Sequence, residues 1–272
     1  MKQKVIVTGA FDDLRSGGIR FLEEAAKFGE LTVLLWPDET VKRLTGRAAH
    51  FPERERRYLL EAIRYVQRVE LAPGVTSPDV VPETPGVRPD LWVVEDSGAN
   101  AAKEAFCRAR GLGCQVIGGE RLKELPEPAA QPPTPGRKKV VVTGCYDWFH
   151  SGHVRFFEEV SAYGDLYVIV GHDANLRLLK GPGHPLLSQE ERRYLVGSVR
   201  HVTQALISSG EGWLDADPEI RRLKPDLYAV NEDGDQGGKR EYCQKLGLDY
   251  FVLKRTPAPG LPPRSSTDLR GF

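Results

Sequence analysis

Residues 140–153 read VVVTGCYDWFHSGH, and this stretch decides the fold of the second half of the chain. Its β-branched start is typical of a buried strand, and Gly144 marks a turn directly after it. Val154, Phe157 and Val160 follow at helical spacing. The stretch therefore predicts a strand, a glycine-containing turn and a helix, the order of elements that begins a parallel α/β domain.

The same pattern occurs earlier in the chain. Residues 5–12 read VIVTGAFD, which matches VVVTGCYD at residues 140–147. The match continues along both halves, and one residue is inserted in the second half partway through it. For example, PDL at residues 89–91 corresponds to PDL at residues 225–227. Because this repeat is far longer than a solenoid unit, the sequence predicts a tandem duplication of one domain.

A proline-rich segment separates the two copies. Residues 124–136 read ELPEPAAQPPTPG, which excludes a helix or a central strand and predicts an extended, semi-stiff linker. We therefore expect a first domain over residues 1–123, a linker over residues 124–137 and a second domain over residues 138–272.

Each copy alternates short apolar strands with helices. In the second copy, strands are expected over residues 166–170, 227–230 and 250–253. Ser188 and Glu191 have the spacing of a capping box, which marks the start of a further helix. This alternation predicts two tandem Rossmann-like domains of the α/β class. Each would be a parallel sheet covered on both faces, with ligands beyond the carboxyl ends of its strands.

The composition excludes several classes of function. The chain of 272 residues has 38 basic and 38 acidic side chains, so a formal net charge of zero gives no reason to expect nucleic-acid binding. No apolar run approaches the ~20 residues that span a bilayer and no signal peptide is visible, so we expect no membrane insertion. Four scattered cysteines without Cys-x-x-Cys spacing favour a cytoplasmic protein without disulfides or a zinc site.

Two histidines stand where the first helix of the second copy begins. His150 and His153 are three residues apart, so both can face one ligand at the first helical turn. A helix N-terminus offers unpaired N–H groups and partial positive charge, which suit a phosphate, and Gly152 lets the backbone approach it closely. The alternative is a pair of ordinary surface histidines, but their position directly after a strand favours a phosphate site.

The motif His150-Ser151-Gly152-His153 resembles the HxGH signature of the nucleotidyltransferase superfamily. The surrounding GCYDWFHSGH is most similar to the cytidylyltransferases that act on glycerol-3-phosphate, phosphocholine and phosphoethanolamine. Three further segments resemble the family in the same order. Lys180 resembles its phosphate-binding lysine, residues 190–202 its arginine-containing helix, and Arg255-Thr256 with Ser265-Ser266-Thr267 its RTxGIST motif.

The resemblance implies a reaction in which a phosphorylated alcohol attacks the α-phosphate of CTP and pyrophosphate leaves. His150 and His153 would stabilise the charge that grows on the phosphates, and Lys180 and Arg200 would bind the acceptor phosphate or the triphosphate. The nucleoside triphosphate implies Mg²⁺, for which Asp147 is the candidate ligand. The nucleotide-binding residues that the resemblance implies are Gly144, Cys145, Tyr146, Asp147, Gly152, Asn231, Asp233, Arg255, Thr256, Ser265, Ser266 and Thr267.

Two alternatives to a cytidylyltransferase stay open. The same stretch resembles heptose-phosphate adenylyltransferases, which would make ATP the nucleotide and a sugar phosphate or cofactor precursor the acceptor. A protein that kept the fold and lost turnover would be a non-catalytic nucleotide sensor, which the intact His150, His153, Lys180 and Arg255 argue against. Residues 257–264 are an insertion relative to the family, so the register of the serines after them is open.

The first copy has lost the residues that carry the chemistry. Arg15 and Gly18 take the places of the two histidines, and Thr45 takes the place of the lysine. We therefore expect this copy to be catalytically inactive. Both copies carry a segment that resembles the family's dimer helix, Arg64-Tyr65-Val66 and Arg200-His201-Val202, so we expect a monomeric internal pseudo-dimer.

Overall fold

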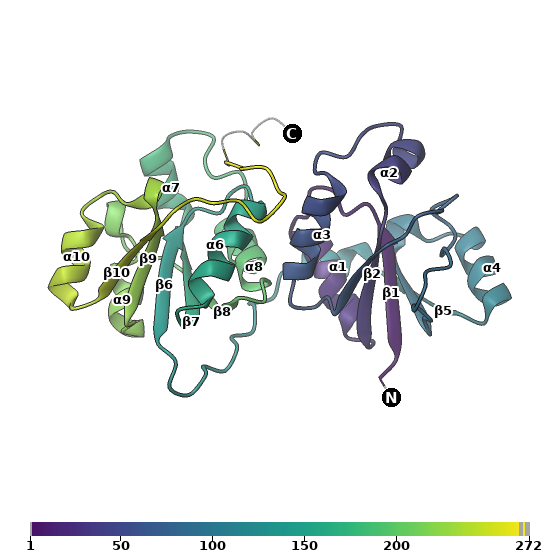
Figure 1. Cartoon of the computed structure of the whole chain (residues 1–272), viewed down its shortest axis with the longest axis horizontal. Coiled ribbons are helices and arrows are strands. Elements are labelled where there is room, and N and C mark those ends of the chain that lie inside the picture. The colour runs from purple at the N-terminus through teal and green to yellow at the C-terminus, as the bar shows by residue number, and fades with distance from the viewer. Residues whose placement is uncertain (1, 267–268, 270–272) are drawn as a thin grey trace. The chain divides into compact units, whose positions relative to one another are not determined.

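The structure is a computed structural model that describes residues 2–266 and residue 269. The chain divides into two compact units, Met1–Leu125 and Pro126–Phe272, called unit 1 and unit 2 below. Each unit holds one five-stranded sheet in which the paired strands are parallel (Figure 1). The predicted class, two Rossmann-like α/β domains built on parallel sheets, is confirmed.

The sheet of unit 1 has the strand order β3-β2-β1-β4-β5. β1 occupies its centre because the run from Val5 to Val7 is apolar on both faces, as a strand covered on both sides requires. The elements of unit 1 are β1 (Lys4–Gly9), α1 (Ser16–Ala26), β2 (Glu30–Leu35), α2 (Asp38–Thr45), α3 (Glu53–Ala62), β3 (Arg68–Leu71), β4 (Leu91–Glu95), η1 (Asp96–Gly98), α4 (Ala101–Arg110), β5 (Gly113–Ile117) and α5 (Gly119–Lys123).

The sheet of unit 2 has the strand order β10-β9-β6-β7-β8. Its central strand β6 contains three fully buried valines, and every residue of the neighbouring β7 is buried. The elements of unit 2 are β6 (Lys139–Gly144), α6 (Ser151–Ser161), β7 (Asp165–Val170), α7 (Asp173–Lys180), α8 (Gln189–Gly197), β8 (Val202–Ile207), η2 (Gly212–Leu214), α9 (Asp217–Leu223), β9 (Leu227–Asn231), η3 (Glu232–Gly234), α10 (Lys239–Leu246) and β10 (Asp249–Leu253).

The two sheets have the same topology. In each, the chain leaves the central strand toward one edge, then crosses back and adds two strands on the other side. The registers also correspond, since Thr8 lies opposite Leu34 and Thr143 lies opposite Ile169. This agreement is what the predicted repeat requires, while the origin of the two halves by duplication stays a prediction.

Helices cover both faces of the sheet in unit 2. Figure 1 shows α6 and α8 on one face and α9 and α10 on the other. The second face holds a core cluster in which Ile220 and Tyr242 pack against strand residues such as Val141. In unit 1, part of the corresponding face is covered by the helix-free connection from β3 to β4, whose Ala72 and Val75 are completely buried.

The crossover creates a crevice at the carboxyl end of each sheet. β6 lies between β7 and β9, and the chain leaves it on one side and returns on the other. Loops that follow β6 and β9 therefore diverge above the sheet, which is where ligands of doubly wound domains bind.

The predicted helix over residues 190–202 is wrong in its second part. α8 ends at Gly197, and Val202 already begins β8. Glycine is a poor helix former, and the run that begins at Val202 has the β-branched composition of a strand. In unit 1, α3 likewise ends at Ala62, before the segment Arg64-Tyr65-Val66.

The proline-rich segment lies against unit 2. The backbone N–H of Gln131 donates to the carbonyl oxygen of Thr203 at 2.8 Å, on the edge strand β8. Glu127 forms an ion pair of 3.0 Å with Arg193. The segment is therefore attached to unit 2 by a hydrogen bond and an ion pair, whereas the sequence predicted an extended, semi-stiff linker without naming such contacts.

Two expectations from composition concern covalent links and membranes. Cys107, Cys114, Cys145 and Cys243 are free thiols in the structure. Within the described residues, no helix combines the length and the apolar character that crossing a bilayer requires.

Candidate active site

The turn between β6 and α6 is shaped by one aromatic side chain. Tyr146 has a φ of 56°, and its buried ring folds back over Gly144. A Cβ at Gly144 would lie 2.7 Å from that ring, so only glycine fits there. The ring packs against Phe157 and His153, with centroid distances of 5.3 and 5.2 Å. This packing fixes the turn that leads into the two histidines.

The two histidines stack on each other at the N-terminus of α6. His150 is the N-cap residue, and its Nδ1 accepts the backbone N–H of Gly152 at 3.1 Å. The ring centroids of His150 and His153 are 3.9 Å apart, with 22° between the planes, and Phe149 stacks on the outer face of His153. Because Nδ1 of His150 is an acceptor, the proton of the neutral ring is on Nε2. The arrangement places two imidazole rings at the positive end of a helix.

The surroundings of His153 favour its neutral form. Burial lowers its pKa well below the ordinary value, and the neighbouring His150, Arg255 and Lys180 lower it further. Such clustered positive groups are the signature of a site built for an anion.

A cavity of about 310 Å³ opens at the carboxyl ends of β6 and β9. The turn after β6 forms one wall, the loop after β9 forms another, and the segment after β10 closes it. Twelve of the residues predicted for the site line this one cavity: Gly144, Cys145, Tyr146, His150, Gly152, His153, Lys180, Asn231, Asp233, Arg255, Ser265 and Ser266.

Arg255 joins the loop after β9 to the inserted segment after β10. Its Nη1 pairs with Asp233 at 2.7 Å, and its Nη2 donates to the carbonyl oxygen of Arg264 at 2.7 Å. The insertion therefore folds back toward α6, and the hydroxyl of Ser266 lies 3.5 Å from the carbonyl oxygen of Trp148. This return brings Ser265 and Ser266 to the cavity, which answers the question of their place that the sequence left open.

Lys239 lines the same cavity and was missed by the sequence analysis. It is the first residue of α10, and its Nζ donates to the carbonyl oxygen of Gly234 at 2.9 Å. Burial lowers the pKa of Lys239, and the nearby carboxylates of Asp215, Asp235 and Asp233 oppose that effect. The sequence held one weak indication of this role, because Lys103 of the first copy corresponds to Lys239.

Asp147, the predicted metal ligand, holds a loop. Its carboxylate is buried and accepts the backbone N–H groups of Leu186 and Leu187, with Oδ1 distances of 2.8 and 2.9 Å. His184 lies beside it, at 3.8 Å. This geometry gives Asp147 a structural place between two loops and adds no support for metal binding.

Arg200 does not reach the cavity of unit 2. It is exposed in the turn between α8 and β8, at the edge of the sheet where strands begin. The cavity lies at the opposite edge, where β6 and β9 end. The expectation that Arg200 contacts a phosphate came from the resemblance to the family's arginine-containing helix, and its place in the structure does not support that contact.

The last two predicted residues lie apart from the cavity lining. Thr256 lines a neighbouring pocket together with Lys254 and Pro257. Thr267 lies outside the described residues.

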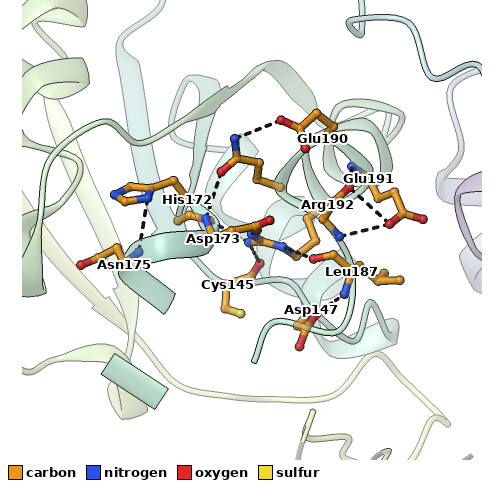
Figure 2. Close-up of polar contacts among 12 residues, drawn as sticks. Cys145, Asp147, His172, Asp173, Asn175, Leu187, Glu190, Glu191 and Arg192 are labelled. Atoms are coloured by element: carbon orange, nitrogen blue, oxygen red, sulfur yellow. Dashed lines mark hydrogen bonds and ion pairs between the residues drawn. The ribbon is translucent and has the colours of Figure 1, made fainter. Parts of the chain in front are cut away.

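Arg192 is the principal structural residue that sequence reasoning gave no role of its own. It is completely buried, and its Nη1 donates to the carbonyl oxygens of Cys145 and Gly171, both at 2.8 Å. Its Nε reaches the carbonyl oxygen of Leu187, and its Nη2 pairs with Asp173 at 2.6 Å (Figure 2). One guanidinium thus ties together the ends of β6 and β7, the start of α7 and the loop before α8.

The site does not contain a preformed metal cage among the described residues. No group of three or more His, Cys, Asp or Glu side chains in that part of the chain is arranged to hold an ion. A magnesium ion brought by a nucleoside triphosphate is held largely by phosphate oxygens and water, so Mg²⁺ stays a prediction from the chemistry of the substrate.

Comparison with known proteins identifies relatives of part of the chain. Residues 141–271 match the family model described as cytidylyltransferase-like. An FAD synthase from Ferroglobus placidus is 37% identical over 120 residues, which cover 43% of this chain and 75% of that protein. The bifunctional protein HldE from Aliarcobacter butzleri is 31% identical over 134 residues, covering 49% of this chain and 27% of that protein.

One solved structure aligns with part of the chain. The lipopolysaccharide core biosynthesis protein from Thermoplasma volcanium GSS1 covers 45% of this chain and 99% of its own, with 22% identity and a TM-score of 0.38. Taken with the sequence relatives, the fold and the site define a nucleotidyltransferase. Within that class, the chain belongs to the cytidylyltransferase-like family, as its HxGH motif predicted.

Proposed function

We propose that unit 2 transfers the adenylyl group of ATP to the phosphate of a phosphorylated alcohol and releases pyrophosphate. The observation that carries the proposal is the stacked pair His150 and His153 at a helix N-terminus. The pair shares one cavity with Lys180, Lys239 and Arg255. Three basic side chains and a helix N-terminus around two imidazoles match a polyanion with several phosphate groups.

We propose a task for each group in the transfer. A phosphate oxygen of the acceptor attacks the α-phosphorus, a new P–O–P link forms, and the bond between the α- and β-phosphates breaks. The electron pair of that bond leaves with pyrophosphate, so no covalent enzyme intermediate is needed. In this proposal Nε2–H of His150 donates to the charge that develops on the α-phosphate, and His153 lies beside it.

The remaining cationic groups position the substrates. Lys180 at the end of α7 and Lys239 at the start of α10 approach the cavity from two sides, and the hydroxyls of Ser265 and Ser266 offer hydrogen bonds to phosphate oxygens. Phosphoryl chemistry of this kind depends mainly on such positioning and charge stabilisation. A Mg²⁺ ion that arrives with the triphosphate would neutralise part of its charge.

ATP is the favoured nucleotide because of the relatives. FAD contains an adenylyl group joined to a phosphorylated flavin alcohol, so the name FAD synthase indicates adenylyl transfer in those proteins. CTP is the second candidate, because the matching family model is described as cytidylyltransferase-like and GCYDWFHSGH resembles cytidylyltransferases. The acceptor is proposed only as a class, a small phosphorylated alcohol.

Pyrophosphate release from the full chain tests the proposal. ATP and CTP would each be offered with riboflavin phosphate, glycerol-3-phosphate, phosphocholine and a heptose phosphate. Release with ATP supports the proposal, and release with CTP alone replaces it with cytidylyl transfer. Saturable nucleotide binding without release from any pair would favour a sensor.

Matched variants show whether unit 2 carries the activity. His150→Ala or His153→Ala should lower turnover by at least ~100-fold, the scale of losing one preorganised donor. Lys180→Ala should raise KM for the nucleotide, whereas Thr45→Ala at the corresponding place in unit 1 should not. Near-normal turnover in both histidine variants would contradict the assignment of the site.

A further inference from the structure

We propose that unit 1 binds a small organic ligand of nucleoside size, one that carries an aromatic ring and hydroxyl groups but no phosphate chain. The site is a cavity of about 600 Å³ at the carboxyl ends of β1 and β4. It lies at the crossover point of its sheet, where ligands of doubly wound domains bind. Its volume is within the range of small-molecule sites, roughly 300–1,000 Å³.

The cavity has a fixed backbone frame. Phe11 has a φ of 45°, like the tyrosine at the corresponding position of unit 2. Arg56 is completely buried and donates to the carbonyl oxygens of Ala10 and Trp36 at 2.5 and 2.9 Å. Its Nη2 also pairs with Asp38 at 2.7 Å, so it makes the same kinds of bond as the buried arginine of unit 2. The cavity is therefore preformed and does not depend on a ligand to shape it.

The groups that suit a polyphosphate in unit 2 are absent or neutralised here. Gly18 brings no side chain where unit 2 has an imidazole, and the hydroxyl of Thr45 donates to the carbonyl oxygen of Val41 at 2.8 Å. Arg15 pairs with Asp13 at 2.7 Å. The positions that carry His153 and Lys180 in unit 2 therefore offer no cation here, and Arg15 is already paired with a carboxylate.

The balance of charge around the two cavities differs accordingly. Among the described lining residues, the cavity of unit 1 has three acidic and three basic side chains, whereas that of unit 2 has one acidic and three basic. One of the three bases in unit 1, Lys103, is buried against Asp79 at 2.7 Å. A triphosphate is therefore disfavoured in unit 1, and an uncharged ligand is not.

The groups that do line the cavity suit a ring with hydroxyl groups. Phe11, Phe21 and Trp36 provide apolar and aromatic surface. The indole N–H of Trp36 is buried and has no acceptor among the described residues. Glu95, at the end of β4, takes the place of an asparagine in unit 2, and burial raises the pKa of its carboxyl. A carboxyl group in this position can accept hydrogen bonds from sugar hydroxyls, as acidic residues of dinucleotide-binding folds do.

Calorimetric titration of the full chain with adenosine and with cytidine tests the proposal. Gly18→Leu adds a bulky side chain to a residue that lines the cavity, and a Cβ at Gly18 approaches only the side chain of Leu14, at 3.2 Å. Glu95→Gln removes the carboxylate charge and keeps the size of the side chain. It therefore tests the same cavity if Gly18→Leu fails to fold. His153→Ala is the matched change in unit 2.

The expected result is saturable binding of at least one nucleoside. Its affinity should fall by at least ~10-fold in both Gly18→Leu and Glu95→Gln, the scale of losing a packed ring or a charged hydrogen bond. The affinity should be the same in His153→Ala as in the unchanged chain, and ATP binding should be the same in Gly18→Leu. Because the readout is nucleoside binding, it does not depend on whether unit 2 turns over.

Three outcomes would overturn the proposal. The first is that neither nucleoside binds. The second is that binding persists in both unit 1 variants and is lost in His153→Ala, which would place the ligand in unit 2. The third is that Gly18→Leu weakens ATP binding as much as nucleoside binding, which would mean that the cavity accepts a phosphate chain.

Discussion

Gly152 leaves no room for a side chain beside His150. A Cβ at this position would lie 2.9 Å from Cε1 of the imidazole ring and 3.0 Å from its Nδ1, so the ring would have to move. Gly152→Ala should therefore displace the ring and lower turnover by about 10- to 100-fold, as small misplacements of catalytic groups do. Steady-state pyrophosphate release, with the melting temperature measured alongside, checks this.

Gly17→Ala is the matched control for that variant. Gly17 is the corresponding residue of unit 1, and a Cβ there meets nothing within 4 Å. We expect it to leave both turnover and melting temperature unchanged. Full turnover in Gly152→Ala would show that the position of the His150 ring does not limit the reaction.

The lowered pKa of His153 predicts a pH dependence of stability. In the unfolded chain this histidine takes up a proton near pH 6.5, whereas in the folded chain it does so only at a lower pH. The unfolded state therefore binds more protons as the pH falls below about 6.5, and the free energy of unfolding decreases there. Urea unfolding between about pH 8 and about pH 5 measures the slope.

His153→Asn removes the titrating group and keeps a polar side chain. We expect the free energy of unfolding of this variant to decrease less over the same pH interval. Equal slopes for the variant and the unchanged chain would show that His153 is not a source of the acid sensitivity.

At the level of elements, the loop between α7 and α8 is fastened to the turn after β6 by Asp147. Asp147→Asn weakens the acceptor for the N–H groups of Leu186 and Leu187, so we expect a stability loss of about 1–3 kcal/mol. Lys180 stands at the start of the same loop, so KM for the nucleotide should also rise. The Mg²⁺ concentration that gives half-maximal activity should stay the same, because the carboxylate serves the loop.

Asp12→Asn offers a control in unit 1. Asp12 accepts the backbone N–H groups of His50 and Phe51 at 2.7 and 2.9 Å, in the same way. It should lower stability by a similar amount without the rise in KM. A large shift in the Mg²⁺ requirement of Asp147→Asn alone would instead favour the metal-ligand role that the sequence suggested.

Local sequence was sufficient for much of the fold. The capping box of Ser188 and Glu191 is present in both directions, and the predicted strands became β7, β9 and β10. The resemblance to the family's helix carried the expected helix past Gly197 to Val202, so β8 was hidden inside a predicted helix although Gly197 and the β-branched run gave local signals of its end. The pairing of β8 with β7, which stabilises the strand, is not visible in the local sequence.

The candidate site also contains residues that local sequence predicts and residues that it does not. His150, Gly152 and His153 are close in sequence, and a strand, turn and helix bring them together by local geometry alone. Lys239 and Ser266 reach the cavity only through the order of strands and through the return of the chain after β10. The spacing of residues along the chain does not predict that such positions belong to the site. They can be identified only from the three-dimensional structure or from a family motif.

At the scale of the whole molecule, the proline-rich segment affects how unit 2 behaves alone. A Cβ at Gly197 would lie 2.5 Å from Pro128, so the segment packs closely on α8, and Gln131 covers part of the edge strand β8. We expect residues 126–272 to be soluble, and residues 138–272 to associate or melt several degrees lower, because an exposed strand edge invites pairing. Sedimentation and thermal unfolding of the two fragments compare them. Identical behaviour would mean that the segment is not part of the folded unit.

The full chain is expected to be a monomer, since two units of the same topology are already present in one polypeptide. Sedimentation equilibrium over a range of concentrations measures this. A single species with the mass of one chain agrees with the prediction, whereas a mass of two chains that persists on dilution contradicts it.

Arg56 and Arg192 make matching hydrogen bonds to the turns after β1 and β6, but the side chains around the two cavities differ. Each arginine holds its turn through main-chain carbonyl oxygens, so this part of the frame does not use the histidines or Lys180. The protein therefore contains two similar main-chain frameworks, and only the one in unit 2 carries the two histidines and Lys180 at its cavity. Exchanging those side chains between the two turns would separate what a scaffold contributes to a reaction from what its functional groups contribute, within a single molecule.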